Sequence, residues 1–155
     1  MDWAKKEVSS VELSKKLKEL GFPQTPDGYY WVKFSENYDL YFYYDLCFDP
    51  EEKEKVWGVH TVSGLVEPAE TIKAPTNSEL GEWLPFYLPE LGFLRIEKNE
   101  DGFHYYYDAI ALKGCYFIEK IEANARAKTL IWLRKNGCIT FNQGDKNNAQ
   151  PRQQT

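Results

Sequence analysis

The chain has 155 residues and a formal net charge of −5 at pH 7, with 19 basic side chains against 24 acidic ones. This acidic balance argues against nucleic-acid binding through phosphate contacts and against adhesion to anionic membranes. No apolar run approaches the roughly 20 residues that a membrane-spanning helix requires. The first residues lack the apolar core of an export signal, so we expect a cytoplasmic protein.

The first predicted elements are a helix and a β-hairpin. Ser9 and Glu12 have the spacing of a capping box, and the leucines that follow recur at helical intervals. The aromatic runs 29–34 and 38–46 are separated by a short polar segment, which predicts a hairpin. In the second run, alternation assigns one set of side chains to the core and the other to a polar face. The core set is Leu40, Phe42, Tyr44 and Leu46, and the polar set is Asp39, Tyr41, Tyr43 and Asp45.

The middle of the chain alternates turns, strands and one short helix. Asp49 and Pro50 are typical of a helix opening, with room for only a short turn after it. A second capping box at 76–79 starts a short helix that Pro85 ends. We also expect a strand over 56–62, a loop over 63–70, and strands over 93–98 and 103–109.

The helix predicted over 122–135 organises the C-terminal part of the chain. It follows a predicted strand at 115–119 and stops at Asn136 and Gly137, a typical left-handed C-terminus. Its basic residues favour an ordinary solvated helix face, with a surface for an anion or an acidic partner as the alternative. The buried stripe of this helix, at i, i+4, i+7 and i+8, consists of Ala123, Ala127, Leu130 and Ile131.

Together these elements predict the α+β class. We expect an antiparallel or mixed sheet of about five to six strands, with helices packed mainly on one face. The length predicts a single domain over residues 1–141. The segment 142–155 is polar and has too few apolar side chains to order itself, so we expect a flexible tail there.

Two segments resemble the signatures of a group of phage proteins. Residues 74–85 read APTNSELGEWLP, which resembles APTxxELxxWLP, and residues 122–133 read EANARAKTLIWL, which resembles EAxARAKxLIxL. Both signatures are similar to segments of small proteins encoded by phages and prophages. The resemblance implies a setting inside a bacterial host and an accessory or host-manipulating role. It supplies no catalytic residues.

The sequence contains no recognisable catalytic or cofactor-binding motif. Nothing in it matches a Walker loop, a dinucleotide-binding glycine motif or a Gly-x-Ser-x-Gly motif. The two histidines and three cysteines lack zinc-ligand spacing, and no basic sequence neighbour marks an activated thiolate. We therefore predict a protein without enzymatic activity, cofactor or metal. The residues considered are His60, His104, Cys47, Cys115 and Cys138.

The remaining candidate site is an aromatic face of the predicted sheet. Alternation places Trp31, Lys33, Tyr41 and Tyr43 on one face of the first hairpin, and either Tyr105 and Tyr107 or His104 and Tyr106 join them. Such a face, with nearby cations, can stack on a nucleic-acid base or bind a partner. Alternatively, a helix covers this face and the aromatic rings belong to the core. The candidate binding residues are Trp31, Lys33, Tyr41, Tyr43, Arg95, Tyr105 and Arg126.

These observations lead to two functional expectations. The first is a non-enzymatic, phage-type accessory protein that binds a macromolecular partner, namely a host or phage protein. The second is a protein that sequesters a nucleotide-like small molecule and so counters a host defence signal. Sequestration requires a concave site that combines stacking aromatics with basic side chains, whereas a flat or convex aromatic patch favours a protein partner. Candidates for the concave site are Trp31, Tyr43, Arg95 and Arg126.

Overall fold

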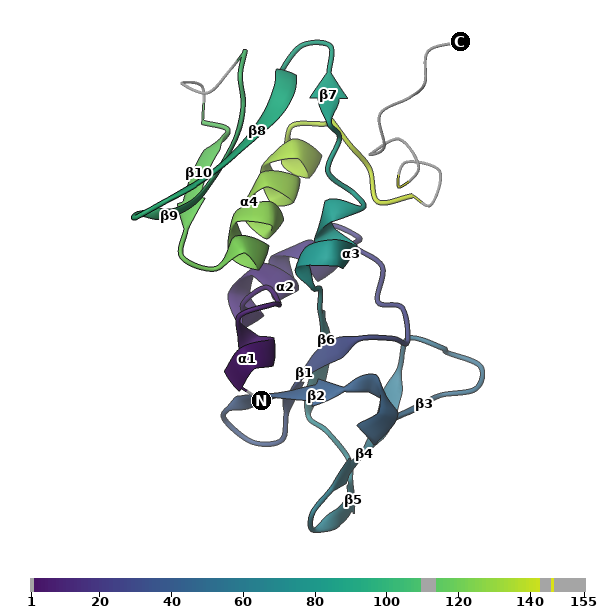
Figure 1. The fold of residues 1–155 in the computed structure, drawn as a ribbon. Coiled ribbons are helices and arrows are strands. Elements are labelled where there is room, and N and C mark those ends of the chain that lie inside the picture. Colours follow the sequence, from purple (N-terminus) through teal and green to yellow (C-terminus); the bar gives the residue numbers. More distant parts are fainter. Residues whose placement is uncertain (1, 110–113, 143–145, 147–155) are drawn as a thin grey trace. The chain divides into compact units, whose positions relative to one another are not determined.

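The computed structural model describes residues 2–109, 114–142 and 146 (Figure 1). Its fold is α+β, as predicted, and its strands form small antiparallel sheets. By its internal contacts the chain divides into two compact units, Met1–Thr76 and Asn77–Thr155. The single domain predicted over 1–141 stays a prediction. Apart from residues 142 and 146, the predicted tail lies outside the described residues.

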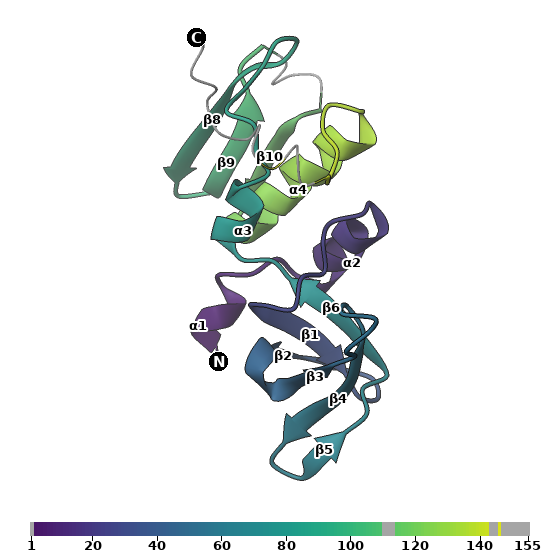
Figure 2. The ribbon, with the colours of Figure 1, turned by 90° about the vertical axis from the view of Figure 1, so that its right-hand side faces the viewer.

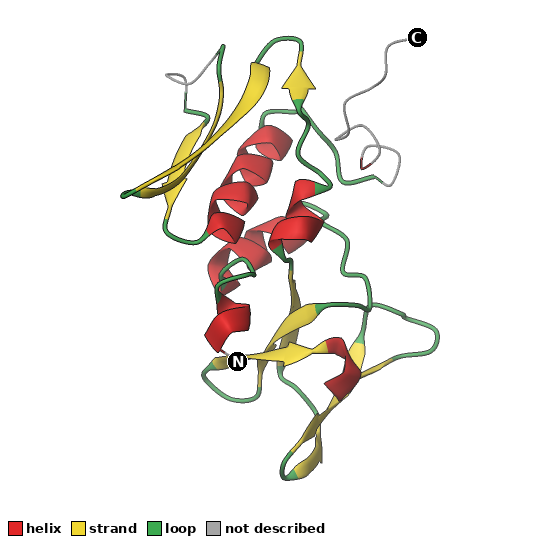
Figure 3. Ribbon diagram, in the orientation of Figure 1, coloured by secondary structure: helices red, strands yellow, loops and turns green. Residues whose placement is uncertain are grey.

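Unit 1, which spans Met1–Thr76, contains two three-stranded sheets and two α-helices among its described residues (Figure 3). One sheet has the strand order β2-β1-β6 and the other β3-β4-β5. Its elements are α1 (Asp2–Lys5), α2 (Val11–Glu19), β1 (Tyr29–Lys33), β2 (Tyr38–Phe42), the 3-10 helix η1 (Tyr43–Asp45), β3 (Leu46–Phe48), β4 (Val56–Thr61), β5 (Gly64–Val66) and β6 (Glu70–Ala74).

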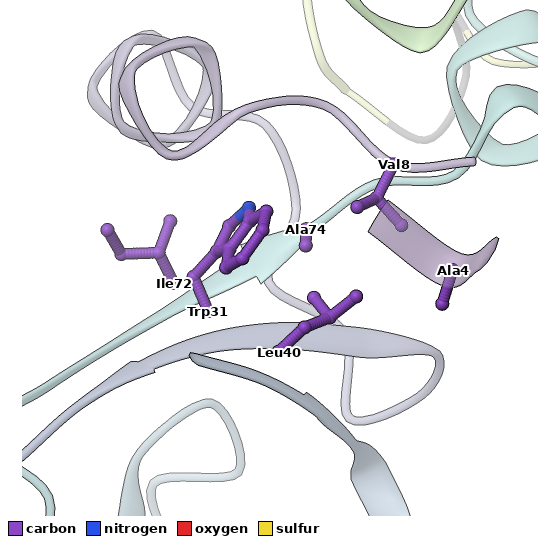
Figure 4. Close-up of a cluster of buried hydrophobic side chains, with 6 residues drawn as sticks. All are labelled: Ala4, Val8, Trp31, Leu40, Ile72 and Ala74. Atoms are coloured by element: carbon purple, nitrogen blue, oxygen red, sulfur yellow. The ribbon is translucent and has the colours of Figure 1, made fainter. Parts of the chain in front are cut away.

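The central strand β1 buries side chains on both of its faces. Trp31 lies opposite Leu40 and Ile72 in the ladder, and these three belong to a cluster on the side of α1 (Figure 4). The neighbours of Trp31 in sequence, Tyr30 and Val32, point to the other face and pack with Leu46 and Val59 of the second sheet. Because one strand serves two cores, a second layer of strands is needed. The single sheet of about five to six strands is therefore wrong.

Local interactions at two positions of unit 1 differ from the predicted ones, and those at a third agree with the prediction. Ser10, not Ser9, caps α2, because its Oγ accepts the backbone N–H of Leu13 at 3.3 Å. The short turn predicted after Asp49 is confirmed, because its carboxylate accepts the N–H groups of Glu51 and Glu52 and residues 50–55 contain no helix. The loop predicted over 63–70 contains β5, because Gly64, with φ at 110°, allows a tight turn back along β4.

Unit 2 packs helices against one four-stranded antiparallel sheet, in the order β10-β9-β8-β7. Helix α4 lies along one face of β9 and β10, and α3 lies beside α4 (Figures 1 and 2). Among the described helices of the chain, none has the length and apolar character that crossing a membrane would take. The elements of unit 2 are α3 (Asn77–Gly81), β7 (Tyr87–Leu88), β8 (Gly92–Asn99), β9 (Gly102–Tyr107), β10 (Tyr116–Glu119) and α4 (Glu122–Lys135).

The predicted helix stripe is confirmed. Ala123, Ala127 and Leu130 are fully buried, and Ile131 is only 7% exposed. Small alanines on the inner face let α4 approach the sheet closely, which brings the larger Leu130 against the strands. The helix therefore fixes which face of the β10-β9-β8-β7 sheet is core and which is open.

Candidate functional site

Two of the predicted binding residues on the first hairpin have different environments. Trp31 is 8% exposed, and its indole N–H donates to the backbone oxygen of Ser9 at 2.9 Å. It is a core residue, so its predicted role on a binding surface is wrong. Lys33 lies opposite Tyr38 in the ladder, and its ammonium lies 5.5 Å from the centre of that ring.

The shared aromatic face predicted for this hairpin does not exist. The register pairs Tyr41 with Tyr30, so Tyr41 points to the face opposite Trp31 and Lys33. There it packs edge-on against Phe34 beside the second core cluster of unit 1. The helix-covered alternative therefore applies to Trp31, and a sheet covers Tyr41.

Tyr43 lies outside the strand. The chain leaves β2 through η1 and then joins the other sheet as β3, so alternation is lost at residue 43. Tyr43 stacks on Tyr44 with ring centres 4.3 Å apart, and Tyr44 is 75% exposed instead of buried as predicted. The hydrogen bond between the two phenols raises the pKa of Tyr43.

Tyr105 and Arg126 bind each other on the helix-covered face of the sheet in unit 2. Arg126 donates from Nε to the Tyr105 hydroxyl at 2.9 Å, from Nη2 to Glu122 at 3.0 Å and from Nη1 to the backbone oxygen of Asn77 at 2.8 Å. Burial, and then the Glu122 hydrogen bond, raise the pKa of Tyr105. With every guanidinium nitrogen of Arg126 engaged, these residues hold α4 to β9 and α3.

The opposite face of the same sheet, which we call the outer face, is exposed in part, although His104 on it is buried. The register places Arg95 beside Tyr106, Tyr106 beside Tyr116, and His104 beside Ile118, all pointing away from α4. Phe93, Tyr116 and Ile118 are 42%, 39% and 47% exposed. The outer face consists of Phe93, Arg95, Glu97, His104, Tyr106, Tyr116 and Ile118.

Polar contacts fix the rings of the outer face. Tyr106 and Tyr116 stack with centres 4.7 Å apart and planes within 2° of parallel. The Tyr106 hydroxyl donates to Glu97 at 3.0 Å, which raises the pKa of Tyr106. His104 is hydrogen-bonded through Nδ1 to the Tyr116 hydroxyl and through Nε2 to Asn99, each at 2.9 Å. The aromatic surface is thus held in place before any partner binds.

Arg95 and the strand β7 extend the outer face toward its edge. Arg95 pairs with Asp108 at 3.0 Å, and its guanidinium carbon lies 5.9 Å from the centre of the Phe93 ring. Phe93 in turn contacts Tyr87 and Phe86, with ring centres 4.8 and 5.5 Å away. Of the outer-face residues, the sequence pattern predicted only Arg95 and, as one alternative, His104 and Tyr106. The alternation of Tyr116 and Ile118 on the next strand was the signal for the rest.

Unit 1 contains a groove of about 790 Å³ between α2, the 52–56 segment and the residues leading into β6. Tyr30 is the one aromatic residue among its described lining residues. This lining combines both charges, so it is not the aromatic and basic pocket that a nucleotide would favour. The charged residues are Lys18, Lys53, Lys55, Glu52, Glu54, Glu67 and Glu70.

In the described part of the chain, no three histidine, cysteine, aspartate or glutamate side chains come close enough together to hold a metal ion.

Comparison of the sequence with protein-family models and with curated proteins, and of the structure with solved structures, gave no match. The outer face is therefore assessed on its own geometry.

Proposed function

We propose that this protein is a non-enzymatic binding protein whose outer face contacts a macromolecular partner. The observation that carries the proposal is a pre-ordered set on the sheet face opposite α4, in which Tyr116, Phe93 and Arg95 are exposed and Tyr106 is half-buried. Tyrosine and arginine are the residue types that most often dominate binding free energy at protein interfaces.

The form of this surface favours a protein over a small ligand. Small ligands bind in concave sites that enclose most of their surface. The outer face is instead the broad side of an antiparallel sheet, on which Tyr106 and Tyr116 stack with parallel rings. Because His104 and Glu97 already hold the hydroxyl groups, a partner need not pay the full entropic cost of ordering the rings.

The phage-type accessory role belongs to the same proposal. It is supported by the resemblance of segments 74–85 and 122–133 to small phage and prophage proteins. On this proposal the partner is a host or phage protein in the cytoplasm of the bacterial host.

Sequestration of a nucleotide-like molecule is the second candidate, and the groove of unit 1 supports it. Its volume of about 790 Å³ lies within the range of small-molecule sites, and three lysines border it. The adjoining glutamates weigh against an anionic ligand, because like charges oppose its binding. This candidate is therefore second to the protein-binding proposal.

The test is a quantitative capture experiment with matched variants. Ile118→Asp places a charge on the outer face, whereas Val62→Asp places one on a fully exposed turn of unit 1. The thermal unfolding midpoints of the native protein and of both variants are first shown to be equal. Each of the three chains is then used to capture proteins and small molecules from the same bacterial lysate.

We expect Ile118→Asp to lower the recovery of a specific protein by about tenfold or more, corresponding to about 1.4 kcal/mol. Val62→Asp should leave that recovery unchanged. Equal recovery by all three chains would rule out the outer face as the contact surface. Recovery of a nucleotide that Ile118→Asp retains and Lys53→Glu loses would favour the second candidate.

A further inference from the structure

Two side chains that lie 13 positions apart in sequence meet on the exposed face of the β3-β4-β5 sheet. Cys47 on β3 lies opposite Gly58 on β4, and His60 is two residues further along β4 on the same face. The Cys47 Sγ is 3.5 Å from the His60 Nε2, a hydrogen-bond distance for sulfur. Leu46 and Val59 point to the other face, where they are buried.

This pair combines a nucleophile with a base. When the ring proton is on Nδ1, the Nε2 atom of His60 accepts the thiol proton of Cys47. The thiolate, not the thiol, is the reactive form of cysteine. His60 is exposed and Cys47 is half-buried, so a small reagent can approach the sulfur from the side of the imidazole.

The other two cysteines have environments that suppress the same chemistry. Cys115 is fully buried, and burial raises its thiol pKa to about 12. Cys138 is half-buried, and burial, followed by the charge of Glu90, raises its pKa as well. Its sulfur lies 3.8 Å from the backbone oxygen of Asn136, an acceptor that cannot take a proton.

We propose that Cys47 is a nucleophilic modification site, with His60 as its base, that exchanges with low-molecular-weight disulfides to form a mixed disulfide. The site is separate from the outer face and does not depend on the protein-binding proposal. Arrangements of a thiol and an imidazole within hydrogen-bond reach are the usual means of activating cysteine nucleophiles.

The exchange balances without any further reactant. His60 takes the proton from Cys47, and the sulfur attacks one sulfur of the disulfide. A bond forms between Cys47 Sγ and that sulfur as the original S–S bond breaks, and the second sulfur leaves with the electron pair. The proton held on His60 then passes to the leaving thiolate. Cys47 is oxidised to the mixed disulfide, and the departing thiol is the reduced product.

The first measurement uses the native chain and glutathione disulfide as the probe. Peptide mass mapping over time gives the rate of mixed-disulfide formation at each cysteine in the same sample. We expect Cys47 to react at least about tenfold faster than Cys138, because His60 lies at the Cys47 sulfur, whereas the acceptor that the described residues place at the Cys138 sulfur is a backbone oxygen. Similar rates at the two cysteines would overturn the proposal without any variant being made.

The second measurement separates the base from a structural effect. We expect His60→Gly to slow the reaction of Cys47 by about tenfold or more and added imidazole to restore much of that rate, while the rate at Cys138 stays constant. If Cys47 of the variant reacted at the native rate, His60 would not be the base. The same would follow if the Cys47 reaction were slower in the variant and added imidazole did not restore its rate. The unchanged rate at Cys138 reports that unit 2 is intact, and a thermal unfolding midpoint equal to that of the native chain reports that unit 1, which contains His60 and Cys47, is intact.

Discussion

The Nε of Arg126 donates a hydrogen bond of 2.9 Å to the hydroxyl oxygen of Tyr105. Arg126 is on α4 and Tyr105 is the fully buried centre of β9, so the bond joins the last helix to the core of the sheet. Glu122, one helical turn earlier, accepts from both residues. The three side chains form a closed polar network in which the charge of the arginine is matched by that of the glutamate.

Removing Arg126 from this network should destabilise unit 2. Arg126→Ala removes one of the two donors to the Glu122 carboxylate and the guanidinium hydrogen bond to the Asn77 carbonyl, and hydrogen bonds to charged groups contribute about 1.5–3 kcal/mol. We expect the free energy of unfolding to fall by about 2 kcal/mol in urea titrations. The matched control is Arg95→Ala. The Arg95 side chain is 55% exposed in its ion pair, so its removal should lower the free energy of unfolding by no more than about 1 kcal/mol. Equal losses for the two variants would contradict this account.

Leu130 provides a test of the helix-to-sheet packing. Its side chain is fully buried, so Leu130→Ala should lower the free energy of unfolding by about 2–5 kcal/mol through lost burial and a residual cavity. Lys135→Ala, on the exposed end of the same helix, should change it by less than about 0.5 kcal/mol. A denaturant midpoint unchanged by Leu130→Ala would mean that a different face of α4 is inward.

Trp31 and Tyr43 should differ sharply in their contribution to stability. Trp31→Ala removes a core indole and its hydrogen bond to Ser9, so we expect a loss of about 3–5 kcal/mol. Tyr43 stacks only on neighbouring rings of η1 and β2, and Tyr43→Ala should cost no more than about 1 kcal/mol. Thermal or urea unfolding of the two variants measures this. If Tyr43→Ala proved as damaging as Trp31→Ala, η1 would have to be part of the core.

Alkaline pH should weaken the fold through Cys115. Burial raises the pKa of its thiol from the ordinary 9.0 to about 12, so the folded chain keeps a proton that the unfolded chain releases. The stabilising effect is complete below pH 9.0 and is lost as the pH rises toward about 12, by at most about 1.4 kcal/mol per pH unit.

The measurement is the change in unfolding free energy between about pH 8 and about pH 10. We expect Cys115→Ala to show a smaller change than the native chain, even though the cavity lowers its stability at both pH values. The buried tyrosines Tyr105 and Tyr107, whose pKa values burial also raises, continue the loss at higher pH. An identical change for both chains would exclude Cys115 as the source.

Local periodicity predicted those parts of the fold that depend on near neighbours in sequence. The stripe around Leu130 follows from spacing alone, because the burial of one helix face sets the period of apolar residues. The first hairpin and the turn between β8 and β9 were predicted for the same reason. These elements are held together by contacts between residues close in sequence, and their residues prefer the same secondary structure in most folds.

The surroundings of several candidate site residues depend on contacts that no local pattern contains. Two of the three acceptors of Arg126 lie 21 and 49 positions away, so its role in joining α4 to β9 and α3 is not visible from the helix sequence. Tyr44 follows the strand alternation in sequence, but the chain changes sheets at η1 and the alternation restarts. His60 reaches Cys47 only through the register of β3 and β4. Each of these depends on which strands pair.

Gly81, the last residue of α3, lies against the guanidinium group of Arg126. A Cβ atom at position 81 would lie 2.3 Å from the Arg126 Nη1, so any larger residue there would push the guanidinium off the Asn77 carbonyl. The residues at positions 81 and 126, one in each of the segments 74–85 and 122–133, are therefore coupled through this contact. In any set of related sequences, we expect loss of glycine at position 81 to be accompanied by loss of arginine at position 126. The pair would be inherited as a single unit.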